Sequence, residues 1–310
     1  MRLDKKGYAI VLMLLVLSIA SCSGGSRGNP RSSEIEDLNY HTGSQGLVLR
    51  FVPGTPPKSV YEGDPLNIMV EYSNKGAYDI FGGQLYISGY DPSFISFYPP
   101  YTSFDAKGKS EFNPLGDLSN THEFYADRVR VPPGVDSYSP RFLVTACYKY
   151  KTEAFKEVCI DPDPFTVAPR EKVCTVHDVS FGTQGAPVAV TTAETTTSRN
   201  RVQFKVHVSN VGGGTVIDNR APITSCHTLL RRSDIDRVSI NAKFSDKFLD
   251  CEPEIIHLVN GNGISVCTYE GGDIGTEAFL TVLNIELFYG YRTSIQTTTN
   301  VYDMPGDTRY

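Results

Sequence analysis

The sequence of 310 residues lacks the short motifs of the commonest hydrolases and nucleotide-binding enzymes. It contains no Gly-x-Ser-x-Gly elbow, no His-Glu-x-x-His zinc motif, and no glycine loop leading into a helix that could cradle a phosphate. Its six histidines are scattered rather than grouped at metal-ligand spacing. Carboxylate pairs such as Glu62 and Asp64 fall in turns, which explain them without catalysis. We therefore expect a non-enzymatic protein that needs no metal or cofactor.

Tryptophan is also absent, and so is helical patterning, because no segment combines a helical apolar period with caps. No basic stripe follows the first few residues, and Lys plus Arg total 29 against 35 Asp plus Glu. This charge distribution argues against nucleic acid as a partner. By contrast, the 18 Tyr, 16 Phe, 27 Gly and 19 Pro residues favour short β-strands separated by many turns. The expected fold class is all-β.

Residues 1–22 have the pattern of an export signal: a basic start, an apolar run over residues 8–19, and a small-residue cleavage site, Ile-Ala-Ser-Cys, that ends at Cys22. This ending resembles the lipobox of bacterial and archaeal lipoproteins, which implies that the Cys22 thiol carries lipid and becomes the mature first residue. The apolar run is shorter than the roughly 20 residues that a helix needs to span a bilayer. An uncleaved membrane anchor and ordinary secretion with a spare cysteine are the alternatives.

Residues 23–43 are rich in Ser, Gly, Asn and charge, with no apolar period. We expect them to form a flexible tether that holds the folded part away from the membrane. The first alternating strand follows at residues 46–52. At the other end of the chain, residues 303–310 are expected to be frayed.

One stretch of the chain occurs twice. Residues 68–79, IMVEYSNKGAYD, return in altered form at residues 204–215 as FKVHVSNVGGGT. Each copy is an alternating run, typical of a half-buried strand, that ends in Ser-Asn-x-Gly, where Asn and Gly favour a turn. We interpret the pair as a duplication and predict two β-sandwich domains, residues 44–169 and 170–302, with a boundary near Pro169.

Six cysteines lie beyond the predicted lipid site, as three disulfides would need. Cys147 and Cys159 lie at equal distances from Glu153, so a chain reversal there would place them opposite each other within disulfide range. We predict that they are bridged, because disulfides persist in exported proteins. The other four, for which spacing leaves three pairings open, are Cys174, Cys226, Cys251 and Cys267. A hairpin turn near residue 260 would not place the third of these opposite the fourth.

Aromatic residues concentrate in residues 86–101, YISGYDPSFISFYPPY. An exposed patch of this kind marks an interaction surface. The candidate surface residues are Tyr86, Tyr90, Phe94, Phe97, Tyr98 and Tyr101. The competing interpretation is that half of these rings face the core while the prolines shape a loop. A separate candidate is the Thr-rich segment 295–302, which could add to a neighbour's sheet edge or form an edge strand within its own chain.

The two turns, Tyr72-Ser-Asn-Lys-Gly76 and Val208-Ser-Asn-Val-Gly212, resemble the turn of CARDB-type and related immunoglobulin-like adhesion modules of bacterial and archaeal surface proteins. The segments that flank these turns, residues 45–49 with Pro56-Pro57 and residues 184–188, resemble an uncharacterised lipoprotein family more than a standard CARDB domain. The chain departs from the antibody pattern, because it has no Trp and no pair of cysteines at the spacing of antibody domains. The resemblance implies tandem immunoglobulin-like β-sandwiches on the outer face of a prokaryotic cell membrane, and it carries over no catalytic residue.

From these features we expect a lipid-anchored, non-enzymatic surface protein. It would serve adhesion, envelope structure or assembly of a surface complex, held to the membrane by Cys22 and partnered by another surface protein or envelope component. One alternative is a carbohydrate-binding or carbohydrate-cleaving surface protein that uses the aromatic stretch. Another is a subunit of an extracellular polymer or secretion apparatus.

Overall fold

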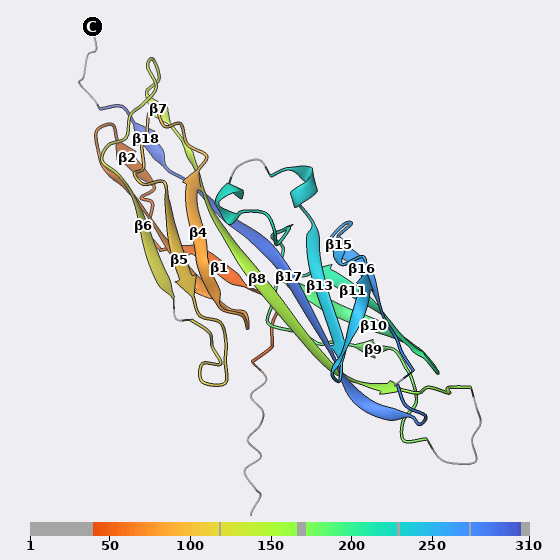
Figure 1. Cartoon of the computed structure of the whole chain (residues 1–310). Helices are drawn as coiled ribbons and strands as arrows, with labels where there is room; N and C mark the ends of the chain where they lie inside the picture. Colours follow the sequence, from red (N-terminus) through yellow and green to blue (C-terminus); the bar gives the residue numbers. More distant parts are fainter. Residues whose placement is uncertain (1–39, 118, 166–171, 228–229, 273, 305–310) are drawn as a thin grey trace, which may run out of the picture. The chain divides into compact units, whose positions relative to one another are not determined.

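Two strands of 20 residues each run side by side through the fold: β8 (Arg141–Ile160) and β17 (Phe279–Thr298). They pair antiparallel along their whole length, with Arg141 opposite Thr298 at one end and Ile160 opposite Phe279 at the other (Figure 1). Every other sheet strand lies beside this pair or packs over it. The pair therefore organises the fold.

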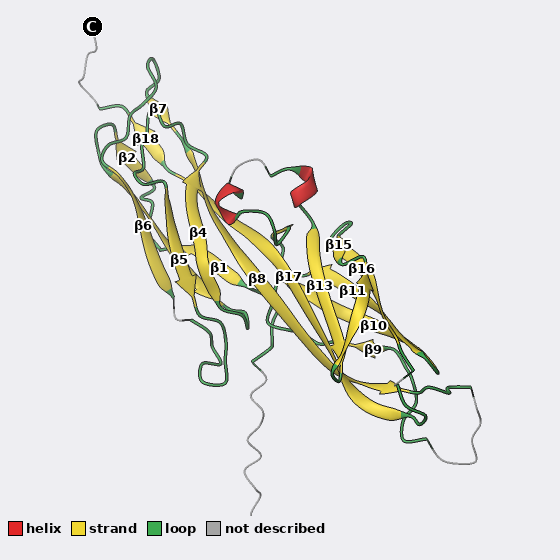
Figure 2. Ribbon diagram, viewed as in Figure 1, coloured by secondary structure: helices red, strands yellow, loops and turns green. Residues whose placement is uncertain are grey.

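The computed structural model describes most of the chain, namely residues 40–304 without 118, 166–171, 228–229 and 273. These residues are all-β, as the composition predicted, apart from two short 3-10 helices, η1 (Ile223–Ser225) and η2 (Arg232–Asp234) (Figure 2). No helix in these ranges has the length and apolarity to cross a membrane. Cys22 and its signal, most of the predicted tether, Pro169 and the tail from residue 305 lie outside the described residues.

The first half, residues 40–150 with 289–304, has two layers. In one layer β3 lies between β1 and β6, and in the other β5 pairs with β4, which pairs with β8. Tyr72 of β3 meets Phe104 of β5 across the core, with ring centroids 5.0 Å apart. The strands are β1 (Leu47–Phe51), β3 (Leu66–Asn74), β4 (Ile80–Ser88), β5 (Tyr101–Ala106) and β6 (Asn120–Ala126).

The second half, residues 151–288, repeats this plan. One layer has the order β14-β16-β11-β10-β9, and the other is β13 beside β17 and β8. Phe204 of β11 meets Phe244 of β13 across the core, with ring centroids 6.4 Å apart. The strands are β9 (Val179–Ser180), β10 (Val188–Ser198), β11 (Arg201–Asn210), β13 (Arg237–Phe244), β14 (Lys247–Glu252) and β16 (Asn262–Glu270).

The repeated Ser-Asn-x-Gly turns occupy matching places at the ends of β3 and β11. In the first turn, Asn74 Oδ1 accepts hydrogen bonds from the glycine amide of the turn at 3.0 Å and from the Tyr150 hydroxyl at 3.2 Å. In the second, Asn210 Oδ1 accepts from the corresponding glycine amide at 3.4 Å and from the Tyr291 hydroxyl at 3.0 Å. Since Tyr150 lies on β8 and Tyr291 on β17, the two long strands hold equivalent places in the two copies.

The shared strand pair does not fit the predicted division into consecutive domains 44–169 and 170–302. β17, from the predicted second domain, pairs throughout with β8 of the first. Further along, β18 (Asn300–Tyr302) lies parallel to β2 (Ser59–Tyr61) and antiparallel to β7 (Ser137–Tyr138). Residues 39–310 form one compact unit. The two halves are interlocked, because the strand that closes each one crosses into the other.

The disulfides correct the predicted Cys147–Cys159 bridge. Cys147 is bonded to Cys226, and Cys159 is bonded to Cys174. The predicted bridge required a chain reversal around Glu153, but residues 151–154 (KTEA) contain no turn-forming Gly, Pro, Asn or Asp and continue as one strand. At about 3.3 Å per residue, Cys147 and Cys159 lie about 40 Å apart along β8.

The third disulfide also differs from expectation, since Cys251 on β14 and Cys267 on β16 lie directly opposite each other and are bonded. The expected tight turn is present, with φ of 52° at Asn260 and 79° at Gly261. However, β15 (Ile255–His257) leaves this hairpin and pairs with β13 instead. Because the hairpin is not continuous, counting residues from the turn gives the wrong partner for Cys267.

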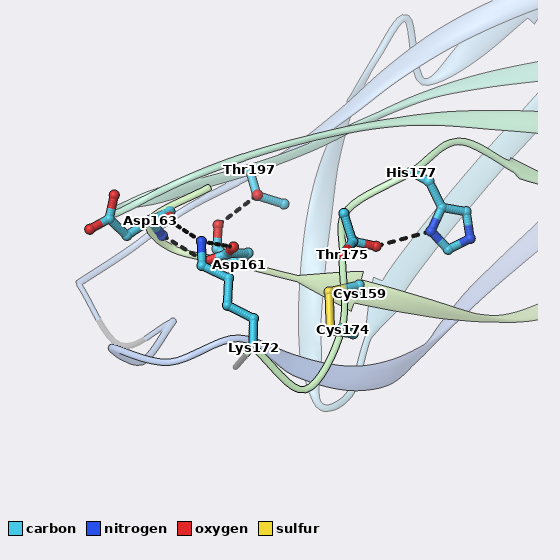
Figure 3. The surroundings of a disulfide bond; sticks show 8 residues. All are labelled: Cys159, Asp161, Asp163, Lys172, Cys174, Thr175, His177 and Thr197. Atoms are coloured by element: carbon cyan, nitrogen blue, oxygen red, sulfur yellow. Dashed lines mark hydrogen bonds and ion pairs between the residues drawn. A yellow bond between two sulfur atoms is a disulfide. The ribbon is translucent and has the colours of Figure 1, made fainter. Parts of the chain in front are cut away.

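A partly buried ion pair lies beside the Cys159–Cys174 bond (Figure 3). Asp161, immediately after β8, places Oδ2 2.6 Å from Lys172 Nζ, and the same ammonium donates to the Asp163 carbonyl at 2.6 Å. The Thr197 hydroxyl donates to the Asp161 carbonyl at 2.6 Å. These contacts hold the chain as it leaves the long strand.

Candidate interaction surfaces

The predicted aromatic surface is divided between the interior and the solvent. Four of its six rings pack against buried clusters: Tyr86, Tyr90, Phe94 and Phe97. Phe97, for example, meets Phe142 of β8 with ring centroids 5.8 Å apart. Tyr98 and Tyr101 face solvent, with 92% and 54% of their surfaces exposed. The candidate site therefore shrinks to these two residues and whatever lies beside them.

An insertion found only in the second half lies beside Tyr86, whose ring neighbours that of Tyr101. β12 (Thr215–Ile217) and β13 both pair with β17, and together they take the place that β4 takes beside β8. Residues 218–236 separate β12 from β13 and cross onto the first half. There Cys226 is bonded to Cys147, and Lys149 Nζ donates to the Ala221 carbonyl at 2.8 Å. The insertion covers the outward side of β8 in the first half.

The insertion completes a small set of aromatic rings, which we call the aromatic ledge: Tyr86, Tyr101 and His227. The His227 ring stacks on Tyr86 with centroids 4.0 Å apart, and the Tyr101 centroid lies 6.1 Å from that of Tyr86. Burial raises the pKa of the Tyr86 hydroxyl, which donates to the Thr224 carbonyl at 3.2 Å. No sequence pattern connects His227 to Tyr86, because the contact depends on where the insertion folds.

A second surface lies on the outward side of β8, β17, β13 and β14 in the second half, and we call it the outer face. The strand register places four residues in one row across it, Phe155, Asn284, Lys243 and Phe248. Phe248 is 76% exposed and Phe155 51% exposed, and Leu280 and Val282 are half exposed on the same side. Grouped exposed apolar side chains of this size indicate an interaction surface.

The outer face contains an open hollow of about 460 Å³ where β14 leaves β13 to join β16. Its wall includes the buried Ile240 and Leu249, and it is also lined by Asp250, Glu254 and the exposed Phe248. Arg220 lines the hollow too, so a partner side chain would meet an apolar wall bordered by charges of both signs.

A three-residue ion cluster borders the row of aromatic side chains. Lys151 Nζ lies 2.6 Å from Glu153 Oε1 and 2.7 Å from Glu286 Oε1. Burial alone would lower the pKa of Lys151, but hydrogen bonds to both carboxylates outweigh it and raise that pKa above its usual value. The ammonium also lies 5.5 Å from the centre of the Phe288 ring. These contacts fix the side chains that frame the outer face.

The remaining predicted residues show no reactive arrangement. The six cysteines beyond the predicted lipid site all form disulfides. Across the described ranges, no group of three or more His, Cys, Asp or Glu side chains is placed to hold a metal ion. The predicted lipid site, Cys22, lies outside those ranges.

Comparison with known proteins gives no family assignment. No family model matches the sequence. No curated protein matches it either. Among solved structures, the chain is similar to Escherichia coli alpha-2-macroglobulin activated by porcine elastase with a TM-score of 0.15 and 11% sequence identity. That match covers 83% of this chain and only 32% of the other, and a likeness this weak carries no argument about fold or function.

Proposed function

We propose that this is a non-enzymatic surface protein, anchored by lipid on Cys22 to the outer face of a prokaryotic cell membrane, that serves adhesion, envelope structure or assembly of a surface complex. Its two halves would be immunoglobulin-like sandwiches of the CARDB-like kind that the repeated turns resemble, joined through their long strands. The three disulfides are consistent with an extracytoplasmic location.

One observation carries this proposal: the two halves differ in what covers the outward side of the shared strands. In the first half the insertion covers it, so Thr145 and Cys147 are buried. In the second half the corresponding side is the outer face, where Phe155 and Phe248 are exposed. A protein that covers this side of its long strands in one half and leaves apolar side chains exposed on it in the other half has a surface suited to a protein partner there.

Crosslinking on intact cells followed by mass spectrometry tests the proposal. The wild type is compared with Phe248→Ser and Val282→Ser on the outer face, and with Phe81→Ser as a control at a 61% exposed ring in the first half. We expect one set of crosslinked proteins from the wild type and Phe81→Ser, and its loss from the other two variants. Crosslinks unchanged by all three substitutions would contradict the role of the outer face. A soluble mature protein without lipid on Cys22 would contradict the anchor.

A specific observation supports carbohydrate binding as a second candidate. Tyr101 of the aromatic ledge faces solvent, as does Tyr98 three residues earlier, and the inner ring of the ledge, Tyr86, is held in place by the His227 stack and by a hydrogen bond to Thr224. Rigid aromatic rings that combine an apolar face with a polar edge can stack on a sugar ring with little rearrangement of the protein. This proposal concerns binding alone.

Glycan-array binding distinguishes this candidate. Tyr98→Ala and Tyr101→Ala remove exposed rings and leave the core intact, so each is expected to weaken any genuine glycan signal. Tyr90 is unsuitable for the test, because its ring packs 5.0 Å from Phe97 and its loss would disturb the core. Binding that survives both substitutions would rule out the aromatic ledge as the glycan site.

The third alternative, a polymer or secretion subunit, relied on residues 295–302 adding to a neighbour's sheet. In the structure, residues 295–298 pair with β8, and residues 300–302 pair with β2 and β7 of the same chain. No observation favours their donation to another molecule.

A further inference from the structure

The loop between β5 and β6 carries two highly exposed apolar side chains. Phe112 is 95% exposed and Leu115 is 74% exposed. The turn that carries Phe112 has its own support, because Ser110 N donates to the Asn113 carbonyl at 3.0 Å and Asn113 N donates back to the Ser110 carbonyl at 3.1 Å. The loop therefore holds apolar side chains in water on a backbone with internal hydrogen bonds.

The same loop lies beside the start of the described chain. Lys109 Nζ donates to the Thr42 carbonyl at 2.9 Å. A hollow of about 380 Å³ is lined by Gly43 and Gln45 on one side and by Lys109 and Leu115 on the other. Figure 1 shows the β5–β6 loop and the first described residues on the same side of the fold. The loop thus marks the end of the folded unit at which the preceding chain enters.

The length of that preceding chain limits how far this end can lie from an anchor at Cys22. Residues 23–39 separate Cys22 from Tyr40. Whatever their conformation, these residues span at most about 60 Å, since a fully extended chain advances about 3.5 Å per residue. A membrane that holds Cys22 therefore lies within about 60 Å of Tyr40, so the β5–β6 loop can reach it.

The chemistry of the loop fits the boundary between lipid headgroups and acyl chains. Phe and Leu side chains bury apolar surface there, and nearby Lys side chains favour anionic headgroups. Lys75, Lys109 and Asp117 line the hollow, whereas Glu111 is an exposed carboxylate next to Phe112. Because these charges largely offset one another, apolar insertion supplies most of the binding, and added salt should weaken it little.

We propose that Phe112 and Leu115 insert into the bilayer that holds Cys22, so that the β5–β6 loop is a second membrane contact beside the lipid. This inference rests on the proposed surface anchoring and specifies how the folded unit meets the membrane. A single lipid chain gives weak, reversible attachment, and a second contact makes it durable. The contact also fixes which side of the unit faces outward.

The absence of Trp from the chain allows a direct test. A chain of residues 23–310, which lacks Cys22 but contains the whole compact unit and its three disulfides, carries Phe112→Trp as its only Trp. Vesicles with equal parts of phosphatidylcholine and phosphatidylglycerol should shift its fluorescence to shorter wavelengths, since the indole moves from water to the interface. The matched control is Phe248→Trp, at a ring that is 76% exposed on the outer face, and its emission should stay unchanged.

Cosedimentation with the same vesicles gives the affinity. The double variant Phe112→Ser/Leu115→Ser should bind at least about tenfold more weakly than the wild-type sequence, because two apolar side chains no longer leave water. Equal binding by the double variant, or an equal loss with Phe248→Ser, would overturn the proposal. Lipid on Cys22 is scored separately from the mass of the mature protein, so a failed anchor and a failed loop contact give different results.

Discussion

Asn74 is a fully buried side chain that makes four hydrogen bonds at the end of β3. Its Nδ2 donates to the Tyr78 carbonyl at 2.7 Å and to the Ala106 carbonyl at 3.2 Å, and its Oδ1 accepts the two bonds described above. Asn210 performs the same task at the end of β11 with a longer bond to its glycine amide and a partly exposed side chain. Asn74 thus supports a more deeply buried turn in the first half than Asn210 does in the second.

This difference predicts unequal costs for equivalent substitutions. Asn74→Ala leaves several buried groups without partners and should lower the free energy of unfolding by about 3 kcal/mol, whereas Asn210→Ala should lower it by about 1 kcal/mol. Urea denaturation of both variants measures the two values, provided the slope with denaturant is unchanged. Equal losses would show that burial of the turn does not set its contribution.

Asp218 gives the insertion a dependence on pH. Its carboxylate accepts from Arg220 Nε at 3.0 Å, Nη2 at 2.8 Å and the Arg220 amide at 2.8 Å. The side-chain hydrogen bonds from Arg220 outweigh burial and hold the pKa of Asp218 below its usual 3.8. Since the folded pKa is the lower one, this stabilisation is present above the unfolded pKa and is lost as pH falls through the folded value.

Asp218→Asn should therefore be less stable than the wild type near neutral pH, and the difference should close as the pH falls below about 4. Urea midpoints measured at several pH values follow this gap. Arg220→Gln is the matched control, because it removes the partner and should reproduce the same trend. A gap that widens in acid would contradict the assigned sign.

Single residues also show where sequence reasoning stops. Strand alternation correctly identified the segment around Ile68, Val70 and Tyr72, but it could not sort the rings of residues 86–101. Pro92, Pro99 and Pro100 interrupt the period there, so the facing of Phe97 and Tyr98 follows from the loop path and not from their spacing. The contact of His227 with Tyr86 required knowledge of the fold.

At the scale of elements, the sequence of β8 contained a signal for one continuous strand. The symmetric placement of Cys147 and Cys159 around Glu153 suggested a hairpin instead. Residues 151–154 lack turn-forming residues, and this argues for one continuous strand. The partner of that strand, however, lies far away in the sequence, and no local pattern encodes a register between such distant segments. The repeated turns predicted two related halves, while the exchange of closing strands between the halves was beyond what they could indicate.

The disulfide pattern tests the continuity of β8. Proteolysis without reduction should yield one peptide pair that joins Cys147 to Cys226 and another that joins Cys159 to Cys174, because a single strand keeps Cys147 and Cys159 far apart. Mass spectrometry identifies both pairs, and reduction should separate them. A peptide pair joining Cys147 to Cys159 would require a hairpin in place of the long strand.

At the scale of the whole molecule, each half depends on residues supplied by the other. Tyr289 of β17, in the first half, accepts from Val188 N at 3.3 Å and lies 2.8 Å from the Thr152 hydroxyl of the second half, while the Tyr150 hydroxyl of β8 lies 3.5 Å from the Gly185 carbonyl. These buried rings lie where the paired strands β8 and β17 pass from one half to the other. Neither half has a complete core or a complete set of hydrogen bonds when the other is removed.

The chain should therefore unfold as a single cooperative unit. Calorimetry of residues 23–310 with the disulfides intact is expected to show one transition, with equal calorimetric and van't Hoff enthalpies. Residues 40–165 alone lack β17 and β18, so they would expose the paired edge of β8 and should aggregate. Two separate transitions, or a folded monomer of residues 40–165, would mean that the halves are independent domains that the paired strands β8 and β17 only connect. Because the paired strands β8 and β17 bury their tyrosines between both halves, we expect that separating these strands would unfold both halves.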